Sequence, residues 1–293
     1  MPVSYTIGSH IFEAPTLSAG LYVVATPIGN LRDITLRALE TLAGCDVIAC
    51  EDTRSSGVLL SRYGIDKPKV SYNEHNADTR GPDLLRQISE GRSVCLISDA
   101  GTPLISDPGQ RLVQEAVDAG LAVVPLPGAS APLAAMMAAG IETDGFLFAG
   151  FSPTKAKARL DWLYRYGQAQ QTVAFFESPQ RLVASLSAMA ETFGPTRQAV
   201  IARELTKLHE TFHRGSLIEL LEEFSTLERV RGELVILLPP DKTEQTQDID
   251  PEPLLREALV TMRTKDAVNS VAALTGLPKQ ALYAKALKLQ NDG

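Results

Sequence analysis

Three short apolar runs in the first half of the chain each end in a loop that contains glycine and proline and leads into a helical pattern. The longest loop, residues 98–109, follows the apolar run 93–97 and carries two glycines, two prolines and two aspartates. The other two loops follow the runs 21–25 and 121–126. Loops at the carboxyl ends of parallel strands meet at one edge of a sheet, where open α/β sheets bind ligands. The pattern therefore predicts a ligand site built from several loops.

The periodicity predicts an α/β protein with two tandem α/β domains, residues 20–135 and 136–240, after an N-terminal tail of residues 1–19 that shows no clear period. Strands and helices alternate in the first domain. Two neighbouring strands in the second domain, 197–203 and 209–214, have no helix between them and indicate a mixed sheet. The expected strands are 21–26, 46–50, 68–72, 93–98, 121–126, 146–150, 171–177, 197–203, 209–214 and 233–238. The principal expected helices are 79–90, 110–119, 132–139, 155–166, 180–193 and 216–224.

A polar stretch, residues 239–248, separates these domains from a helical module at 249–293. The first expected helix of this module has an apolar face around Leu254 and Leu255. Asp266 is expected to cap a second helix that Gly276 ends, and Pro278 lies where a third helix would start. Three short helices with a glycine-bearing turn favour a helix-turn-helix-like module, and a simple helical brace is the alternative.

The net charge of −7 argues against a general nucleic-acid binder, because RNA-binding surfaces are usually basic. Binding to RNA would depend on local groups of basic side chains, although short runs of this kind are commonly solvated helix faces. The candidate groups are Lys155, Lys157 and Arg159; Arg203 and Lys207; and Lys279, Lys285 and Lys288.

Several features favour a cytoplasmic protein. No apolar run approaches the roughly 20 residues that cross a bilayer. The first residues lack a basic segment followed by an apolar core, so we expect no secretory signal. The three cysteines, Cys45, Cys50 and Cys95, lie in or beside apolar runs and are expected to be buried thiols.

One segment, residues 209–213, matches the zinc-protease pattern H-E-x-x-H. In zinc proteases the two histidines share one face of a helix. Here Thr211 and Phe212 favour a strand, which would place His209 and His213 too far apart to chelate well. We therefore expect no metal site here.

Eight motifs occur in order between Leu21 and Leu238, and together they resemble the ribosomal RNA small subunit methyltransferase I family of the tetrapyrrole-methylase-like class. The motifs are VATPIGNLRDIT, CEDTR, ISDAGTPLISDPG, PLPGASA, FAGFSPTKAKAR, FFESPQRL, ARELTKLHE and RGELVILL. The first of them replaces the glycine-rich first loop typical of tetrapyrrole methylases, which favours the RNA branch of the class.

The resemblance implies that S-adenosylmethionine is the methyl donor and binds between the two α/β domains. It implies a homodimer that methylates the ribose 2′-oxygen of a cytidine in the decoding region of 16S rRNA, on RNA or on the small ribosomal subunit, without a role for DNA or membranes. The residues that would line the donor site by this resemblance are Pro27, Ala100, Gly101, Thr102, Ile105, Ser130, Ala131, Phe176 and Gly232.

A ribose hydroxyl is a poor nucleophile until its proton is removed, so a base or a strongly orienting group is expected. We expect Asp52, Arg54, Glu204 and Lys207 to carry the reaction, because both segments follow strands and combine acids with cations. The sequence does not single out the base. The wider set of candidates also holds Asn30, Asp33, Glu51, Glu74, His75, Asn76, Glu177, Arg181 and Arg203.

Two other functions fit parts of the chain. A small-molecule methyltransferase acting on a tetrapyrrole would share the donor site but would not need the C-terminal module. A sensor that binds the donor without turning it over would join an α/β domain to a nucleic-acid reader. Methyl transfer to small ribosomal subunits separates the three.

Overall fold

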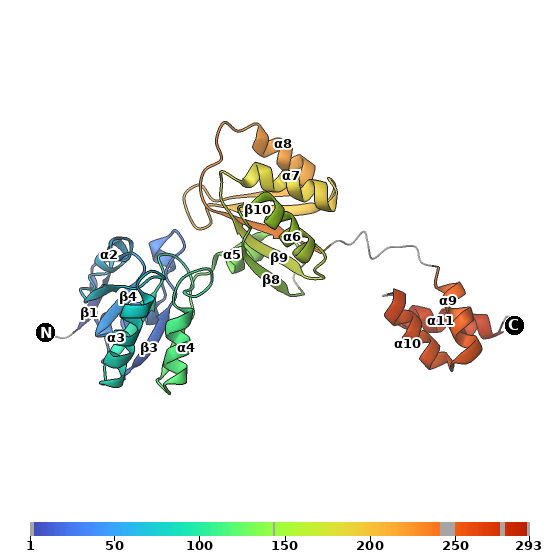
Figure 1. Ribbon diagram of the computed structural model, residues 1–293. Coiled ribbons are helices and arrows are strands. Elements are labelled where there is room, and N and C mark those ends of the chain that lie inside the picture. Colours follow the sequence, from blue (N-terminus) through green and yellow to red (C-terminus); the bar gives the residue numbers. More distant parts are fainter. Residues whose placement is uncertain (1–2, 143, 241–249, 276–278, 292–293) are drawn as a thin grey trace. The chain divides into compact units, whose positions relative to one another are not determined.

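The computed structural model describes residues 3–142, 144–240, 250–275 and 279–291. The chain divides into two compact units, Met1–Pro239 and Pro240–Gly293. Within the described residues, the larger unit contains two five-stranded sheets and a hairpin, and the smaller unit contains three helices (Figure 1).

The first sheet is parallel throughout and has the strand order β5-β4-β6-β3-β7. Its strands are β3 (Gly20–Val24), β4 (Val47–Cys50), β5 (Lys69–Ser71), β6 (Ser93–Ile97) and β7 (Val123–Leu126). The connections contain the short 3₁₀ helix η1 (Leu31–Asp33) and the helices α1 (Leu36–Gly44), α2 (Thr53–Arg62), α3 (Ala77–Ser89) and α4 (Gln110–Asp118). Every strand expected for this domain is present, with ends shifted by one or two residues.

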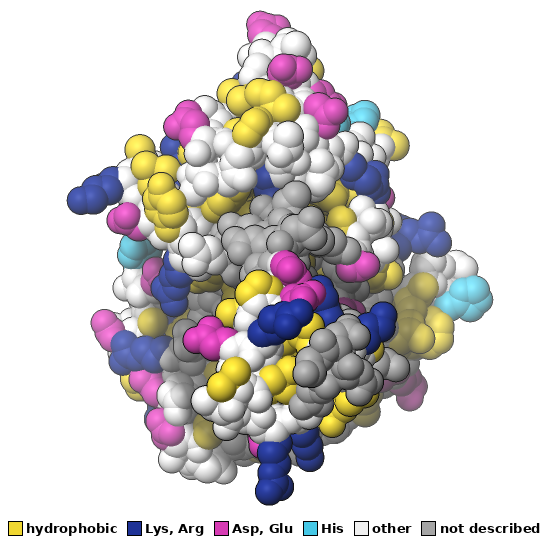
Figure 2. Space-filling model, turned by 90° about the vertical axis from the view of Figure 1, so that its right-hand side faces the viewer, with side chains coloured by type: hydrophobic (Ala, Val, Ile, Leu, Met, Phe, Trp, Pro, Cys, Tyr) yellow, Lys and Arg dark blue, Asp and Glu magenta, His cyan; other side chains and the backbone are white. Residues whose placement is uncertain are grey.

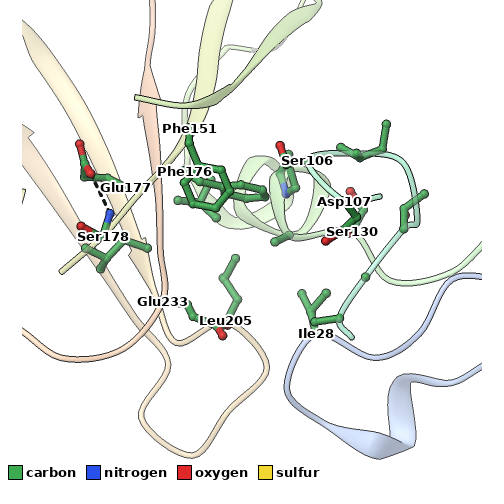
Figure 3. Close-up of a pocket in the computed structure, with 18 of the residues that line it drawn as sticks. Ile28, Ser106, Asp107, Ser130, Phe151, Phe176, Glu177, Ser178, Leu205 and Glu233 are labelled. Carbon is green, nitrogen blue, oxygen red and sulfur yellow. Dashed lines mark hydrogen bonds between the residues drawn. The ribbon is translucent and has the colours of Figure 1, made fainter. Parts of the chain in front are cut away.

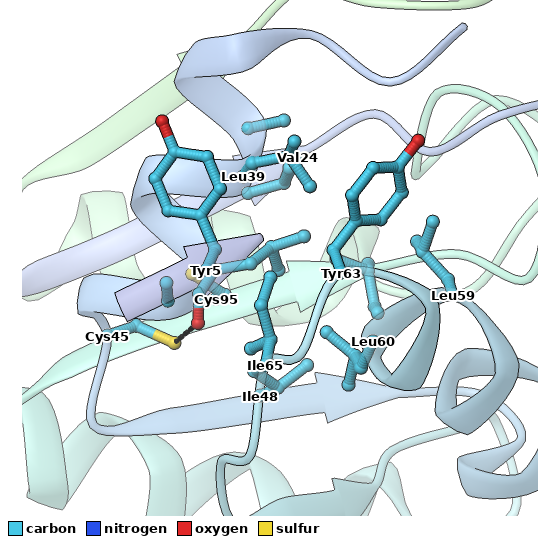
Figure 4. Close-up of a cluster of buried hydrophobic side chains, with 14 of the residues drawn as sticks. Tyr5, Val24, Leu39, Cys45, Ile48, Leu59, Leu60, Tyr63, Ile65 and Cys95 are labelled. Carbon is cyan, nitrogen blue, oxygen red and sulfur yellow. Dashed lines mark hydrogen bonds between the residues drawn. The ribbon is translucent and has the colours of Figure 1, made fainter. Parts of the chain in front are cut away.

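Helices cover both faces of this sheet, which explains why β4 and β6 are apolar without alternation. Residues of α1 and α2 pack on one face and residues of α3 and α4 on the other. Leu39, Leu60 and Ile48 belong to the first of these cores, together with the three cysteines (Figure 4). All three cysteines are buried free thiols, as expected.

The segment expected to be a loose N-terminal tail is instead a hairpin of β1 (Ser4–Ile7) and β2 (His10–Glu13). Tyr5 is only 3% exposed and packs into the core of the first sheet (Figure 4). The amide of Thr6 donates to the carbonyl oxygen of Tyr63 at 2.8 Å. The prediction was wrong because Tyr5 gains its partners from residues distant in sequence. Burial of one large side chain contributes about 1.5–3 kcal/mol, enough to attach a short hairpin.

The second sheet is mixed and has the order β11-β10-β12-β9-β8, with only β8 and β9 parallel. Its strands are β8 (Phe146–Phe151), β9 (Thr172–Glu177), β10 (Gln198–Arg203), β11 (Thr211–Ser216) and β12 (Leu234–Leu238). Its helices are α5 (Ala131–Ala138), α6 (Ala156–Gly167), α7 (Leu182–Phe193) and α8 (Leu217–Ser225). The mixed sheet confirms the expectation drawn from the two adjacent strands.

Helix α5 connects the two sheets in sequence but packs on the second one. Ala135 and Ala139 lie in a core with Val200 and Val235, and Arg214 of β11 donates to the carbonyl oxygens of Ala138 and Ala139 at 2.6 and 2.9 Å. These bonds satisfy carbonyl groups that a helix end leaves without partners. Helices α6, α7 and α8 cover the opposite face.

The smaller unit contains α9 (Pro251–Thr261), α10 (Thr264–Thr275) and α11 (Lys279–Asn291) around a core that includes Leu255, Val268 and Leu282. Asp266 was expected to cap the second helix but lies in its first turn, because the helix already starts at Thr264. Residues 241–248 of the expected linker, residue 249 of the expected module, Gly276 and Pro278 lie outside the described residues.

Candidate functional site

The loops after β3 and β6 meet at the edge of the first sheet. Thr26 and Gly101 exchange two backbone hydrogen bonds, at 2.8 and 3.1 Å. The loop after β6 turns sharply, with positive φ at Gly101 (82°), Leu104 (73°) and Ser106 (66°). A residue other than glycine in this conformation costs about 1–3 kcal/mol, and such strain is often found at functional sites. Two strained residues in one loop therefore mark residues 98–109 as more than a connection.

A cavity of about 420 Å³ lies between these loops and the second sheet. Figure 3 shows Ser106, Asp107, Ser130 and Ile28 on one side of it and Phe151 and Phe176 on the other. The first side comes from the loops after β3, β6 and β7. The second side comes from the ends of β8 and β9, the loop after β10 and the start of β12, so both sheets are needed to enclose the cavity.

Eight of the nine residues expected to hold the donor line this cavity. They are Ala100, Gly101, Thr102, Ile105, Ser130, Ala131, Phe176 and Gly232. Pro27 does not line it. Pro27 is buried and the next residue, Ile28, faces the cavity instead. The sequence motifs therefore identify residues that lie together, and the loop after β3 contributes the neighbour of the expected residue.

An aromatic wall on the side of the second sheet includes a residue that the sequence reasoning missed. The ring of Phe176 lies 5.0 Å from that of Phe148 and 5.1 Å from that of Phe151. Phe151 lines the cavity and is 56% exposed, although it is large and apolar. Exposed aromatic faces beside a cavity suit the stacking of a flat ring. Phe151 lies in the motif FAGFSPTKAKAR, and this motif was the signal in the sequence that could have identified it.

Glu177 also lines the cavity, but its carboxylate is fully occupied. The side chain is 0% exposed and lies 2.8 Å from the guanidinium of Arg181. Its oxygens also accept from the hydroxyls of Ser152 and Ser185 and from the amide of Ser178. A buried carboxylate whose oxygens accept from this many donors organises the turn after β9. Glu177 is therefore a poor choice for the base.

Asp52 and Arg54, two of the expected catalytic residues, do not line the cavity. Asp52 caps α2 and lies 2.7 Å from the guanidinium of Arg54. Hydrogen bonds from Arg54 lower the pKa of Asp52 to about 2, so this carboxylate accepts a proton poorly near neutral pH. Arg54 is 90% exposed and remains a candidate for contact with a phosphate.

Glu204 and Lys207, the other expected catalytic residues, lie at the rim rather than in the lining. The ammonium of Lys207 is 2.9 Å from Glu204 and 3.0 Å from Glu233, and Glu233 and Leu205 do line the cavity. The Lys207 bond holds the pKa of Glu204 below its usual range. A Cβ at Gly29 would lie 2.6 Å from Cγ of Lys207, so the Lys207 stem packs against the first loop. The ion pairs join two loops of the second sheet, and the Lys207 stem brings them against the loop after β3 of the first sheet.

Most of the wider set of candidates make structural contacts. Asn30 caps η1, and the Asn76 side chain closes the turn before α3. Arg181 binds Glu177, and Arg203 donates to the carbonyl oxygen of Arg231 at 2.6 Å. Among these candidates, only Glu177 lines the first cavity and only Glu74 lines the second one described below; the others, Asn30, Asp33, Glu51, His75, Asn76, Arg181 and Arg203, line neither.

The candidate set omitted three acidic residues that line the cavity, Asp99, Asp107 and Glu233. Asp107 lies in the loop after β6 and is half-buried. Burial, with the nearby charges of Glu51 and Asp99, raises the pKa of Asp107 to about 6. A carboxyl group tuned toward neutral pH in a cavity is typical of a functional site. The sequence signal was its place in the motif ISDAGTPLISDPG.

The zinc-protease pattern forms no metal site in the described residues. Strand β11 begins at Thr211, so His209 lies before the strand and not within it as expected. His213 instead contacts Glu223 at 2.7 Å and Thr211 at 3.1 Å. No group of three or more metal-binding side chains occurs in the described part of the chain.

Comparison with known proteins gives two matching family models. The model for tetrapyrrole (corrin/porphyrin) methylases matches residues 20–221, and the model for the RsmI C-terminal HTH domain matches residues 245–290. Proteins named ribosomal RNA small subunit methyltransferase I are similar over nearly the whole length. The one from Mesorhizobium japonicum is 49% identical over 97% of both chains, and the one from Haemophilus influenzae is 45% identical over 91% of this chain and 96% of its own.

Solved structures share the fold at low identity. Diphthine synthase has a TM-score of 0.60 at 15% identity, covering 75% of this chain and 89% of its own. Uroporphyrin-III C-methyltransferase from Thermus thermophilus, complexed with S-adenyl homocysteine, has a TM-score of 0.53 at 19% identity, covering 74% and 96%. In the described residues, no helix is both long and apolar enough to cross a membrane.

Proposed function

The chain belongs to the ribosomal RNA small subunit methyltransferase I family, whose methyl donor is S-adenosylmethionine, and from this premise we propose that it methylates the ribose 2′-oxygen of a cytidine in the decoding region of 16S rRNA. The observation that carries the proposal is the cavity between the two sheets, lined by residues from the family motifs. The proposal places the protein in the cytoplasm, acting as a homodimer on RNA or the small ribosomal subunit.

The cavity has the chemistry that the donor requires. The donor combines an adenine ring with a sulfonium and an ammonium group, and it supplies the methyl group for transfer to an oxygen. Phe151 and Phe176 offer an aromatic wall for the ring, and Asp99 and Glu233 place carboxylates around the same cavity for the positive charges. We assign the donor to this cavity, with Ala100, Gly101 and Ser130 among the residues that hold it.

The protein's main contribution to such a reaction is positioning. Methyl transfer from a sulfonium to an oxygen is an in-line displacement, and alignment of two bound reactants can supply about 7–11 kcal/mol. The ion-pair network of Glu204, Lys207 and Glu233 fixes the loops that enclose one side of the cavity. Arg54, whose side chain is 90% exposed, is proposed to hold an RNA phosphate beside the acceptor, because cations fix the register of RNA without reading bases.

Contact with RNA has to come from limited regions of the surface. Figure 2 shows lysine and arginine side chains scattered among acidic ones, with no continuous basic surface on the face in view. Lys155 and Lys157 are exposed at the start of α6. In the C-terminal module Lys279 and Lys288 are exposed, whereas Lys285 binds Asp250 at 2.8 Å. We propose that α6 and the module provide the RNA contacts.

The two alternatives explain less. A tetrapyrrole methyltransferase would leave the match to the RsmI C-terminal HTH domain without a role. A sensor that binds the donor without turnover would have no need for a half-buried carboxyl group in the donor cavity.

The test is single-turnover methylation of purified small ribosomal subunits with the full chain, followed by mass spectrometry of the product nucleoside. We expect 2′-O-methylcytidine. A methyl group on the base would refute the assigned position, and transfer to a tetrapyrrole in place of RNA would support the first alternative. Removal of residues 250–293 is expected to lower the affinity for RNA and to make this affinity depend less on salt concentration. The affinity for the donor is expected to stay the same. Unchanged RNA affinity across salt concentrations would contradict the role of the module.

A further inference from the structure

A second cavity lies beside the first one and shares a wall with it. Its lining comes from the loop after β5 with the start of α3, and from the end of the long loop with the first two turns of α4. Asp107 lines both cavities. The residue that the linings of the two cavities share therefore carries a carboxyl group.

The side chains around the second cavity are suited to a nucleobase. Glu74 and Gln110 line it, and both are exposed and make no hydrogen bond or ion pair within the described part of the chain. A carboxylate accepts from the amino group of cytosine, and an amide can both donate and accept at a base edge. The cavity thus offers unused polar groups at its mouth.

The one cation in the lining is already neutralised. Arg111 binds Asp78 and lies 2.8 Å from Glu115. A phosphate would have to compete with both carboxylates for this guanidinium. The cavity therefore favours the neutral base and sugar of a nucleotide, with the phosphates held elsewhere.

Asp107 itself is free to act on a ligand. Its carboxyl group makes no hydrogen bond or ion pair within the described residues. Burial and two neighbouring acids, Glu51 and Asp99, raise its pKa to about 6, so it is mostly ionised yet basic near neutral pH. The other charged groups in the linings of the two cavities are Glu74, Arg111, Glu115, Glu177 and Glu233.

We propose that the second cavity receives the target nucleotide and that Asp107 accepts the proton of its 2′-hydroxyl group. This inference rests on the proposed function and names the acceptor site and the base for it. The bond from the ribose oxygen to the methyl carbon forms as the bond from that carbon to the sulfonium sulfur breaks, with its electron pair left on sulfur. The hydroxyl proton passes to the Asp107 carboxylate. The charges balance, because a sulfonium and a carboxylate become a thioether and a carboxylic acid.

The first experiment replaces Asp107→Asn in the full chain. Single-turnover methylation of small subunits is expected to fall about 10²–10⁴-fold, the usual contribution of a general base. The affinity for S-adenosylhomocysteine, measured by calorimetry, is expected to change less than about threefold, a difference below 1 kcal/mol. Full activity of this variant overturns the role of Asp107. Loss of product binding with an unaltered melting curve overturns it too, because Asp107 would then hold the donor.

The second experiment uses Glu51→Gln to test the protonation itself. Removing one negative charge near Asp107 lowers its pKa, so the acidic limb of the rate against pH moves to lower pH. The carboxyl carbon resonance of Asp107 is expected to titrate near pH 6 and to shift in the same direction in the variant. An acidic limb that stays in place while this resonance moves overturns the assignment of the base.

The third experiment fills the second cavity. Gln114→Trp adds bulk in its lining, and Val117→Trp adds the same bulk at a position on the same helix that is 56% exposed and outside the lining. We expect Gln114→Trp to raise KM for small subunits at least about tenfold, with calorimetric affinity for S-adenosylhomocysteine unchanged and Val117→Trp near wild type. Equal KM values for the two variants overturn the acceptor site.

In each experiment, 2′-O-methylcytidine from the wild-type protein shows that the proposed function stands even where the inference fails.

Discussion

The two α/β halves contribute different things to the same cavity. The first half brings strained loops at the carboxyl edge of a parallel sheet, with positive φ at Leu104 and Ser106 and an acid, Asp107, without a partner in the described residues. The second half brings a mixed sheet with an aromatic wall and an acid, Glu177, that is 0% exposed and fully bonded. From this comparison we propose that the first half holds the reactive groups and the second gives the cavity its shape. Four measurements test this division.

The largest effect is expected on stability, from Glu177→Ala. Breaking a buried pair by removing one partner costs about 3–5 kcal/mol, because Arg181 keeps its charge in a site where it is only 23% exposed. Urea unfolding measures the change. Glu191→Ala is the matched control on the next helix, because Glu191 is exposed and bonds only to Ser187. If Glu177→Ala lowers the free energy of unfolding by less than about 1 kcal/mol, the second half is not organised by this acid.

The next effect is expected on donor binding, from Ala100→Phe. Ala100 is exposed and lines the cavity, whereas Gly101 has φ +82° and would be strained by any side chain. We expect donor affinity to fall at least about a hundredfold, or 2.7 kcal/mol, because the ring occupies the cavity. Calorimetry with S-adenosylhomocysteine measures it. Ala119→Phe, exposed after α4 and outside the lining, is the control. Wild-type affinity in Ala100→Phe would move the donor elsewhere.

A smaller loss of donor affinity is expected from Phe176→Ala. This change removes the central ring of the aromatic wall and leaves the carboxylates of the first half in place. We expect affinity to fall about tenfold, corresponding to the 0.5–1.5 kcal/mol of an aromatic pair with some lost burial. The same calorimetric titration gives the number. A normal melting curve is required as the control, and undiminished affinity would mean that the second half does not shape the donor site.

The smallest expected effect is a gain in stability, from Asp107→Asn. The folded protein raises the pKa of Asp107 from 3.8 to about 6, so between these values the native state binds more protons than the unfolded state. This contribution to stability is present at low pH and is lost as pH rises from about 4 to 6. At pH 7.5, Asp107→Asn should therefore stabilise the fold by about 1 kcal/mol, after allowance for solvent screening. Urea unfolding at pH 4 and pH 7.5 checks this, with destabilisation at pH 7.5 as the contrary result.

The sequence by itself determined the two α/β patterns and the mixed second sheet, because the period of apolar residues and the glycine and proline content of loops are local properties of the chain. The resemblance of its motifs to a known family named the nine residues expected around the cavity, of which eight line it. The motifs also marked the strained loop, since residues 98–109 carry more chemistry than a turn needs.

Only the tertiary structure decided which charged residues are free. Asp52 and Glu204 looked like candidate bases beside strands, but each is bound to a nearby cation that lowers its pKa. Asp107 has no such cation bound to it among the described residues, and its pKa is raised by burial, by Glu51 from another loop and by Asp99 from its own loop. Tyr5 likewise finds its core only when the hairpin meets residues far along the chain. Burial and charge pairing depend on distances in space, so they involve residues that are far apart in the sequence.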